Sequence, residues 1–273
     1  MEKLSRNSRV AIITKILKEN PNKIIGLNRF SELLNAAKST ISEDIVIVRD
    51  SLEKMSMGTI ETISGAAGGI KFVPNMGEEE ISEFVNELCE LMSSEERLVA
   101  SKFIYVTDLM FDPAIISKAG VLLASFFKDK EIDYIVTVET KGIPLAYEVA
   151  KNLGVQVVVA RRDSKVTEGS TISINYLSGT SERIQQMCLS KKSLRVGSKC
   201  VFIDDFMRGG GTAKGILNLL KEFDSELVGI GVLVDNKISN NKVVEDYISI
   251  VDIEELSEGA GIKVVPSKNI PQK

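Results

Sequence analysis

The 273-residue chain contains no histidine. Without an imidazole it cannot build a serine or cysteine hydrolase site that relies on a histidine base, nor a zinc site with histidine ligands. Any proton transfer would fall to carboxylates, lysine or tyrosine. The missing residue type therefore excludes several common classes of hydrolytic and metal site.

Cysteines and long apolar runs are scarce. Cys89, Cys188 and Cys200 are odd in number, far apart and without metal-site spacing, so reduced thiols are expected. No apolar run approaches the roughly 20 residues that cross a bilayer. The N-terminal stretch "MEKLSRNSRV" lacks the apolar core of a secretory signal. These absences predict a cytoplasmic protein with no membrane partner, and no internal repeat is present.

The charge is divided unevenly along the chain, although the net charge is only −4. Residues 1–74 contain 11 basic and 8 acidic side chains, a net of +3, which leaves −7 for the remainder. A basic front on an acidic body predicts two domains, 1–74 and 75–273, and a polyanion as partner of the first. Scattered surface charge is the alternative reading.

The first domain shows helical spacing of apolar residues and then strand-like alternation. Asn28 and Ser42 are expected to cap the second and third helices. The predicted elements are helices at 5–19, 28–37 and 42–55 and strands at 58–65 and 68–74. Three helices followed by a glycine-tipped hairpin are typical of a winged helix-turn-helix domain, with a generic small α+β domain as the alternative.

In a winged helix the third helix enters the major groove of DNA. Basic and hydroxyl side chains at its start, on the first helix and on the hairpin are suited to phosphates and base edges, whereas Glu43 and Asp44 are unfavourable there. The candidate DNA-binding residues are Arg6, Arg9, Lys38, Ser39, Thr40, Ser42 and Lys71. A protein-interaction module is the alternative, and a steep salt dependence of binding would argue for DNA.

In the second domain, continuous apolar strands alternate with helices, which indicates an α/β fold with a parallel sheet covered on both faces. The predicted elements are helices at 78–98, 113–129, 143–154 and 212–223 and strands at 132–140, 155–162, 199–206 and 227–235. Three of these strands end in polar residues, at 139–142, 161–163 and 204–205. Because sites in such sheets lie at the carboxyl ends of the strands, the three endings are expected to converge.

The stretch "VFIDDFMRGGGTAKG" follows one of these strands. Its glycines allow backbone N–H groups to surround a phosphate at the start of a helix, although the Walker ending is absent. Two carboxylates beside a phosphate-binding turn would repel the phosphate unless a sugar lies between the carboxylates and the phosphate. The vicinal hydroxyls of that sugar would donate hydrogen bonds to Asp204 and Asp205, or Mg2+ would link the hydroxyls to the carboxylates. A glycine-rich turn with a surface acidic pair is the alternative.

An apolar strand, "DDFMRGGGT" and then a helix resemble the phosphoribosyl pyrophosphate (PRPP) signature of type I phosphoribosyltransferases. The resemblance implies that the acidic pair holds the ribose hydroxyls and residues 207–213 the 5′-phosphate. "VETKGIP" is similar to the family's pyrophosphate loop, which often carries a non-proline cis bond. "ARRDSKVTEGSTISINYLSG" takes the place of its mobile flap. The candidate effector-binding residues are Thr140, Lys141, Gly142, Arg161, Arg162, Lys165, Asp204, Asp205, Phe206, Met207, Arg208, Gly209, Gly210, Gly211, Thr212, Ala213, Phe103 and Tyr105.

Phe103 and Tyr105 belong to this set because aromatic rings can stack on a base. Core or dimer packing is the alternative for both. Arg208 with Gly209 departs from the ordinary signature, where small residues are common, and would add a phosphate contact or narrow the pocket. This departure counts against catalytic turnover.

Nearly the whole chain resembles the purine operon repressors of Gram-positive bacteria, through the winged domain, the transferase-like body, "SKVTEGSTISINYLSG" and "IDDFM". The resemblance implies a homodimeric, non-catalytic regulator that binds operator DNA of purine synthesis and salvage genes and senses PRPP. No metal site is expected from the protein alone, and Mg2+ would arrive with PRPP. Guanine nucleotides with diphosphates are candidate competitors. The alternative is an active purine (xanthine-type) phosphoribosyltransferase with an accessory domain.

Overall fold

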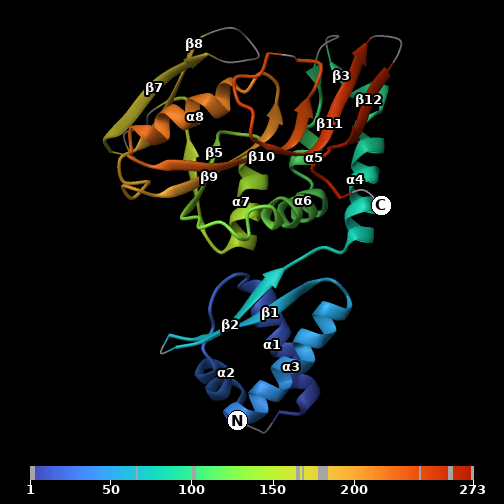
Figure 1. Ribbon diagram of the computed structural model, residues 1–273, viewed down its shortest axis with the longest axis vertical. Coiled ribbons are helices and arrows are strands. Elements are labelled where there is room, and N and C mark those ends of the chain that lie inside the picture. The colour runs from blue at the N-terminus through green and yellow to red at the C-terminus, as the bar shows by residue number, and fades with distance from the viewer. Residues whose placement is uncertain are drawn as a thin grey trace. The chain divides into compact units, whose positions relative to one another are not determined.

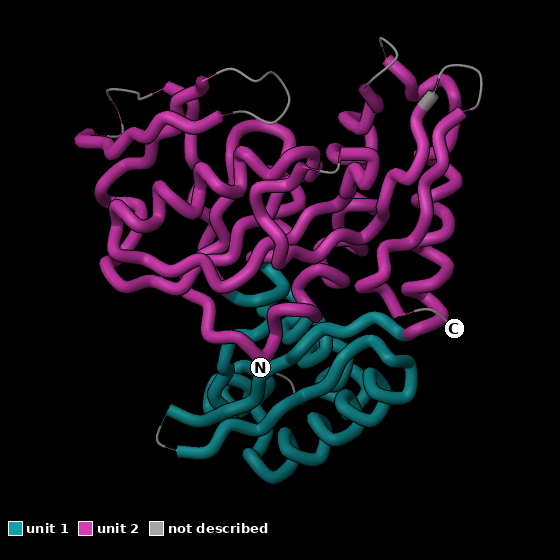
Figure 2. The backbone as a smooth tube through the Cα atoms, turned by 45° about the horizontal axis from the view of Figure 1, so that its top comes forward, with its two compact units in different colours: residues 1–77, 151–154 teal, residues 78–150, 155–273 magenta. Residues whose placement is uncertain are grey.

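The computed structural model describes residues 4–65, 67–99, 103–163, 167, 169–177, 184–239, 241–257 and 261–271. The chain forms two compact units, residues 1–77 with 151–154 and residues 78–150 with 155–273 (Figure 2). The first unit thus ends close to the boundary that the sequence predicts after residue 74. No helix in the described part of the chain has the length and apolarity needed to span a bilayer.

The first unit contains three helices and a hairpin, as the sequence predicts (Figure 1). The elements are α1 (Arg6–Glu19), α2 (Leu27–Leu34), α3 (Lys38–Lys54), β1 (Gly58–Ile63) and β2 (Gly69–Pro74). The two strands pair antiparallel, from Gly58 opposite Pro74 to Ile63 opposite Gly69. Apolar side chains of all five elements share one core, with Ile13, Phe30, Ile41, Ile60 and Phe72 among them.

Two predicted helix caps in this unit are wrong. α2 begins after Gly26, so Asn28 lies inside the helix. α3 begins after Ala37, four residues before the predicted start, because the chain re-enters helical geometry soon after the left-handed Asn35 (φ 46°). Ser42 therefore lies within α3, where its hydroxyl donates to the carbonyl of Lys38 at 2.9 Å.

The second unit is built on a six-stranded sheet in the order β12-β11-β10-β9-β5-β6. All neighbouring strands run parallel except β11 and β12, which are antiparallel. The strands are β5 (Tyr134–Val138), β6 (Gln156–Ala160), β9 (Lys199–Met207), β10 (Glu226–Asn236), β11 (Ile248–Ser257) and β12 (Gly261–Pro266). Every residue of β5 is buried, as expected for a central strand with both faces covered.

Helices cover both faces of this sheet, with α8 on one side and α6 and α7 on the other (Figure 1). The helices are α4 (Glu78–Met92), η1 (Glu95–Arg97), α5 (Thr107–Met110), α6 (Pro113–Ser125), α7 (Ile143–Leu153) and α8 (Gly211–Lys221). Two short hairpins complete the unit, β3 (Leu98–Val99) with β4 (Phe103–Ile104) and β7 (Thr171–Leu177) with β8 (Ile184–Ser190). The β7–β8 hairpin, expected only as a flap, packs on the α8 side, where Tyr176 and Met187 join the core.

Candidate functional site

A pocket of about 550 Å³ lies at the carboxyl ends of the parallel strands. β5 pairs with β9 only as far as Val136 opposite Phe202, yet β9 continues to Met207 alongside β10. The two strands therefore part. The chain runs from β5 to β6 on one side and later returns as β9 on the other, so the strand order reverses here. Such a switch point is where open α/β sheets bind ligands.

The acidic pair lies on β9 where it leaves β5. Asp204 and Asp205 both line the pocket, and the backbone N–H of Asp205 donates to Asp204 Oδ1 at 2.9 Å. Burial raises the pKa of the Asp204 carboxyl well above its usual range, and the neighbouring charge of Asp205 raises it further. A ligand that donates hydrogen bonds, or brings a cation, would therefore stabilise the ionised form of Asp204.

The glycine turn forms a second wall. Gly210 has φ +78°, in the left-handed region that glycine favours, and precedes the first residue of α8. The first N–H groups of a helix have no partners within it and lie at its positive end. Thr212 adds a hydroxyl to the same wall. The turn is thus built to hold an anion.

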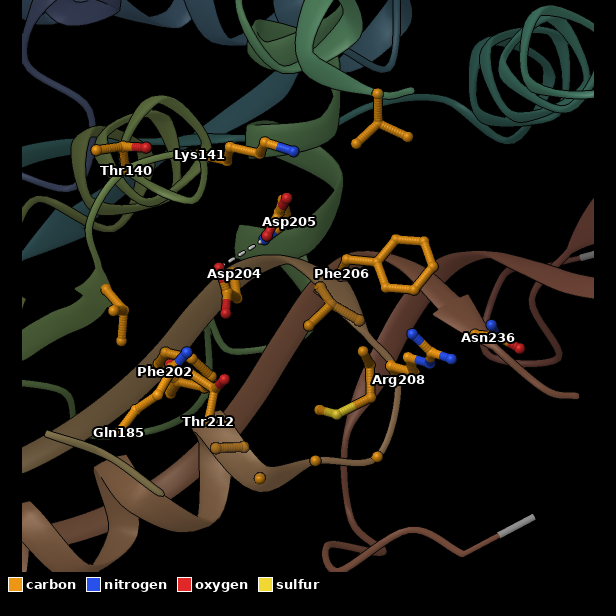
Figure 3. A pocket seen from close by; sticks show the side chains of 18 of the residues that line it. Thr140, Lys141, Gln185, Phe202, Asp204, Asp205, Phe206, Arg208, Thr212 and Asn236 are labelled. Carbon is orange, nitrogen blue, oxygen red and sulfur yellow. Dashed lines mark hydrogen bonds between the residues drawn. The ribbon is translucent and has the colours of Figure 1, made fainter. Parts of the chain in front are cut away.

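The loop between β5 and α7 forms a third wall. Thr140 and Lys141 line the pocket, and the peptide bond from Glu139 to Thr140 is cis. Gly142 lies behind the wall, where a Cβ would come within 2.7 Å of Asp204 Oδ1 and 2.6 Å of Thr137 Oγ1. In the close-up, Thr140 and Lys141 lie on one side of the acidic pair, and the glycine turn with Thr212 lies on the other (Figure 3).

Not all predicted effector residues line the pocket. The lining includes Phe103, Thr140, Lys141, Arg162, Asp204, Asp205, Phe206, Met207, Arg208, Gly209, Gly210, Gly211, Thr212 and Ala213. Gly142, Arg161 and Tyr105 are not part of it, and Lys165 lies outside the described residues. Arg161 is turned toward Glu139, with 3.7 Å between Nη1 and Oε2. In a strand, Tyr105 would point to the same face as Phe103, but β4 ends at Ile104 and this alternation of side chains stops there. Tyr105 is 48% exposed.

Arg208 and Phe103 close one end of the pocket. The guanidinium carbon of Arg208 lies 5.5 Å from the centre of the Phe103 ring, which is cation–π distance. Of the two roles the sequence suggests for Arg208, this geometry favours narrowing the pocket.

Several lining residues were missed by the sequence interpretation, among them Tyr176, Gln185 and Asn236. Asn236 follows Asp235 at the carboxyl end of β10, so the rule that identified the other strand endings would have found it. Tyr176 and Gln185 face each other across β7 and β8, and the tyrosine hydroxyl donates to the amide oxygen at 2.8 Å. No local pattern indicates that this hairpin folds over the pocket.

In the first unit, the structure corrects the role of Arg9. Its Nε lies 2.6 Å from Asp44 Oδ2 and its Nη2 3.2 Å from Asp44 Oδ1, and both residues are buried. A guanidinium engaged in this way cannot reach a phosphate. Arg6 is exposed but pairs with Glu43 at 2.9 Å, and Lys71 of the hairpin pairs with Glu61 at 2.8 Å.

The other predicted DNA contacts lie at the start of α3. Lys38, Ser39 and Ser42 are exposed and Thr40 is half-buried. These side chains keep the accessibility that a nucleic-acid contact requires. Because α3 begins at Lys38, they lie on its first turns rather than on a loop before it.

Comparison with known proteins identifies both units. A family described as "Bacterial purine repressor, N-terminal" matches residues 5–74, and one described as "Phosphoribosyl transferase domain" matches residues 107–265. The adenine phosphoribosyltransferase of Thermoanaerobacter pseudethanolicus shares the fold, with a TM-score of 0.53 at 21% identity, over 61% of this chain and 98% of that one.

Relatives of two kinds are similar in sequence to this chain. The purine biosynthesis transcriptional repressor PurR of Bacillus subtilis is 45% identical over 93% of this chain and 90% of its own. The purine biosynthesis transcriptional activator PurR of Lactococcus lactis subsp. lactis is 38% identical over 93% of both chains. The xanthine phosphoribosyltransferase of Bacillus cytotoxicus is 27% identical over 62% of this chain and 89% of its own. The repressor N-terminal match and the near full-length identity to these regulators show that the chain belongs to the bacterial purine repressor family, with a phosphoribosyl transferase domain as its second part.

Proposed function

We propose that the protein is a DNA-binding transcriptional repressor of purine synthesis and salvage genes, and that PRPP bound in the pocket lowers its affinity for operator DNA. The full-length similarity to purine biosynthesis regulators supports the first part. The second part rests on one observation: a single pocket unites the acidic pair, the glycine turn and the β5–α7 loop.

Each part of PRPP has a matching wall. The ribose hydroxyls would donate to Asp204 and Asp205, the 5′-phosphate would accept from the backbone of the glycine turn and Thr212, and the diphosphate would lie against Thr140 and Lys141. Within the described residues, no three acidic, histidine or cysteine side chains are placed to hold a metal ion. Asp204 and Asp205 would hold the Mg2+ that arrives with PRPP, and its charge would offset that of the diphosphate.

The first unit would bind duplex DNA as a winged helix, with α3 in the major groove and the β1–β2 hairpin as the wing. The net charge of this unit is modest, so a homodimer that presents two half-sites would supply the remaining affinity.

Guanine nucleotides with diphosphates would compete with PRPP. Their phosphates suit the same walls, and the pocket lining also includes apolar side chains on which a base would pack. These are Phe103, Ile104, Val106, Phe206 and Leu256. The phosphates would supply most of the affinity and these apolar side chains the preference for a nucleotide.

An active purine phosphoribosyltransferase is the second candidate. The similarity to xanthine phosphoribosyltransferase supports it, but covers 62% of the chain, whereas the transcription regulators align over 93%. Incubation with PRPP, Mg2+ and each purine base separates the two functions, because a working enzyme would form nucleotide at about 1 per second or faster.

Calorimetry with PRPP and Mg2+ tests the proposed effector. The wild-type chain is expected to bind, and Asp204→Ala or Asp205→Ala to lose binding because the hydroxyl acceptors are gone. Lys221→Ala is the matched control, since this exposed lysine lies at the far end of α8. Both acidic-pair variants should still bind DNA. An absence of heat from the wild type, or loss of DNA binding in the variants, contradicts the assigned roles.

A further inference from the structure

The side of α3 that borders the hairpin differs in charge from the side that faces α1. Asp44 is buried against Arg9, and Glu43 pairs with Arg6. Both acids near the start of α3 therefore form ion pairs with arginines of α1. These are the acids that made α3 look unfavourable for DNA. Their pairing leaves the hairpin side of the helix start without a free carboxylate from either residue.

A groove of about 730 Å³ runs along this hairpin side. Lys38, Ser42, Val46 and Arg49 line it, at spacings of four, four and three residues that place them on one helical face. Asn28 of α2 and Thr62 of β1 line it as well. Among the described residues of this lining there is no acid but there are two cations, so its charge is complementary to a nucleic-acid backbone.

Arg49 fixes the two borders of the groove to each other. Its Nε donates to the carbonyl of Ile60 at 2.8 Å, and its Nη2 donates to Thr62 Oγ1 at 3.2 Å. These bonds join the middle of α3 to β1. The helix and the hairpin therefore present one continuous surface to a partner.

Val46 is the unusual residue of this face. Its side chain is 46% exposed, whereas the adjacent Ile45 is 3% exposed in the core. Base edges in the major groove present hydrogen-bond donors and acceptors, and the C5-methyl group of thymine is the apolar exception. An exposed valine among Lys38, Ser42 and Arg49 is therefore suited to pack against the methyl group of a thymine.

Resting on the DNA-binding function proposed above, we propose that duplex DNA lies against this groove, with Val46 packed on a thymine methyl in the major groove and Lys38 on a phosphate. Val46 is then a sequence-reading residue, whereas Lys38 contributes affinity without sequence preference. Arg49 positions the reading helix relative to the hairpin.

The test uses the full chain and a duplex that it selects from a random-sequence pool. Each thymine of that duplex is replaced in turn by deoxyuridine, which removes only the methyl group. At one thymine per half-site, the replacement should weaken wild-type binding about fourfold, the equivalent of one buried CH2 group. Val46→Ala should bind the thymine duplex more weakly and respond less than twofold to the same replacement.

Ile47→Ala is the matched control, since Ile47 is 37% exposed on the same helix but does not line the groove. It should keep the wild-type response to deoxyuridine. Lys38→Ala should weaken binding to all duplexes and lower the salt slope by about one. The Val46 proposal is overturned if Val46→Ala retains the full deoxyuridine response or if Ile47→Ala loses it. A chain that selects no duplex would instead overturn the DNA-binding function itself, and the Val46 proposal with it. Unchanged thermal unfolding of each variant shows that the fold is intact.

Discussion

Asp204 and Asp205 are adjacent and line the same pocket, so their negative charges repel each other. The raised pKa of Asp204 follows from its burial and from Asp205 beside it. Burial likewise raises the pKa values of the Cys89 and Cys200 thiols to about 12, but these cysteines belong to the core. Asp204, in contrast, lines a cavity, so its raised pKa indicates a role in binding.

The affinity for PRPP should depend on pH through Asp204. In the free protein the raised pKa favours the protonated acid, whereas ribose hydroxyls and Mg2+ favour the carboxylate and lower that pKa. Binding therefore releases protons at pH values between the bound and free pKa, and affinity falls as the pH drops through the free value. Calorimetry across this range, in two buffers of different ionisation enthalpy, measures the release.

Asp204→Asn is the control for this pH dependence, because it keeps an acceptor oxygen but does not titrate. In this variant, the pH dependence of PRPP affinity should come only from titration of the ligand's own phosphates. If wild type and variant show the same pH profile, Asp204 does not ionise on binding.

At the scale of the elements, the segment between β10 and β11 packs against the glycine turn. The backbone N–H of Val243 donates to the carbonyl of Gly209 at 3.0 Å, and a Cβ at Gly210 would lie 2.7 Å from Val244 Cγ2. The fully buried Asp235 anchors this segment by accepting from Tyr247 Oη at 2.7 Å and pairing with Lys242. Asp235 pairs in register with Met207, at the base of the turn.

Asp235→Asn should therefore weaken PRPP binding without removing a group that touches the ligand. The charge-assisted bonds from Lys242 and Lys237 are lost and the segment loosens. Affinity should therefore fall about tenfold, the equivalent of one such bond. Calorimetry measures the affinity and thermal unfolding the stability. Glu254→Gln is the control, since it breaks the exposed ion pair with Lys263 on β11 and β12. Equal PRPP affinity in Asp235→Asn and wild type would rule out the anchoring role.

On the scale of the whole molecule, regulation requires that effector and DNA influence each other's binding. PRPP can shift the molecule only if it binds the two functional forms with different affinity. One relative is named a repressor and another an activator, so the direction of this coupling is the quantity to measure.

For this chain, PRPP with Mg2+ should weaken binding to the selected duplex, and the duplex should weaken PRPP binding by the same factor. Fluorescence anisotropy gives the first factor and calorimetry the second. Asp205→Ala should bind DNA normally but show no response to PRPP. A factor of one in both measurements would show that the pocket does not control the DNA-binding form.

The sequence alone determined the two-part organisation and most of the pocket. Continuous apolar strands specify a buried parallel sheet, whose strand endings meet at one edge, so Lys141, Asp204 and the glycine turn were identified from local pattern. Tertiary structure decided whatever depends on residues distant in the chain. It buried Arg9 against Asp44, 35 positions away, and it folded Tyr176 and Gln185 over the pocket. Charge and strand period are local properties, whereas the partner of a charged group is fixed only when packing brings distant segments together.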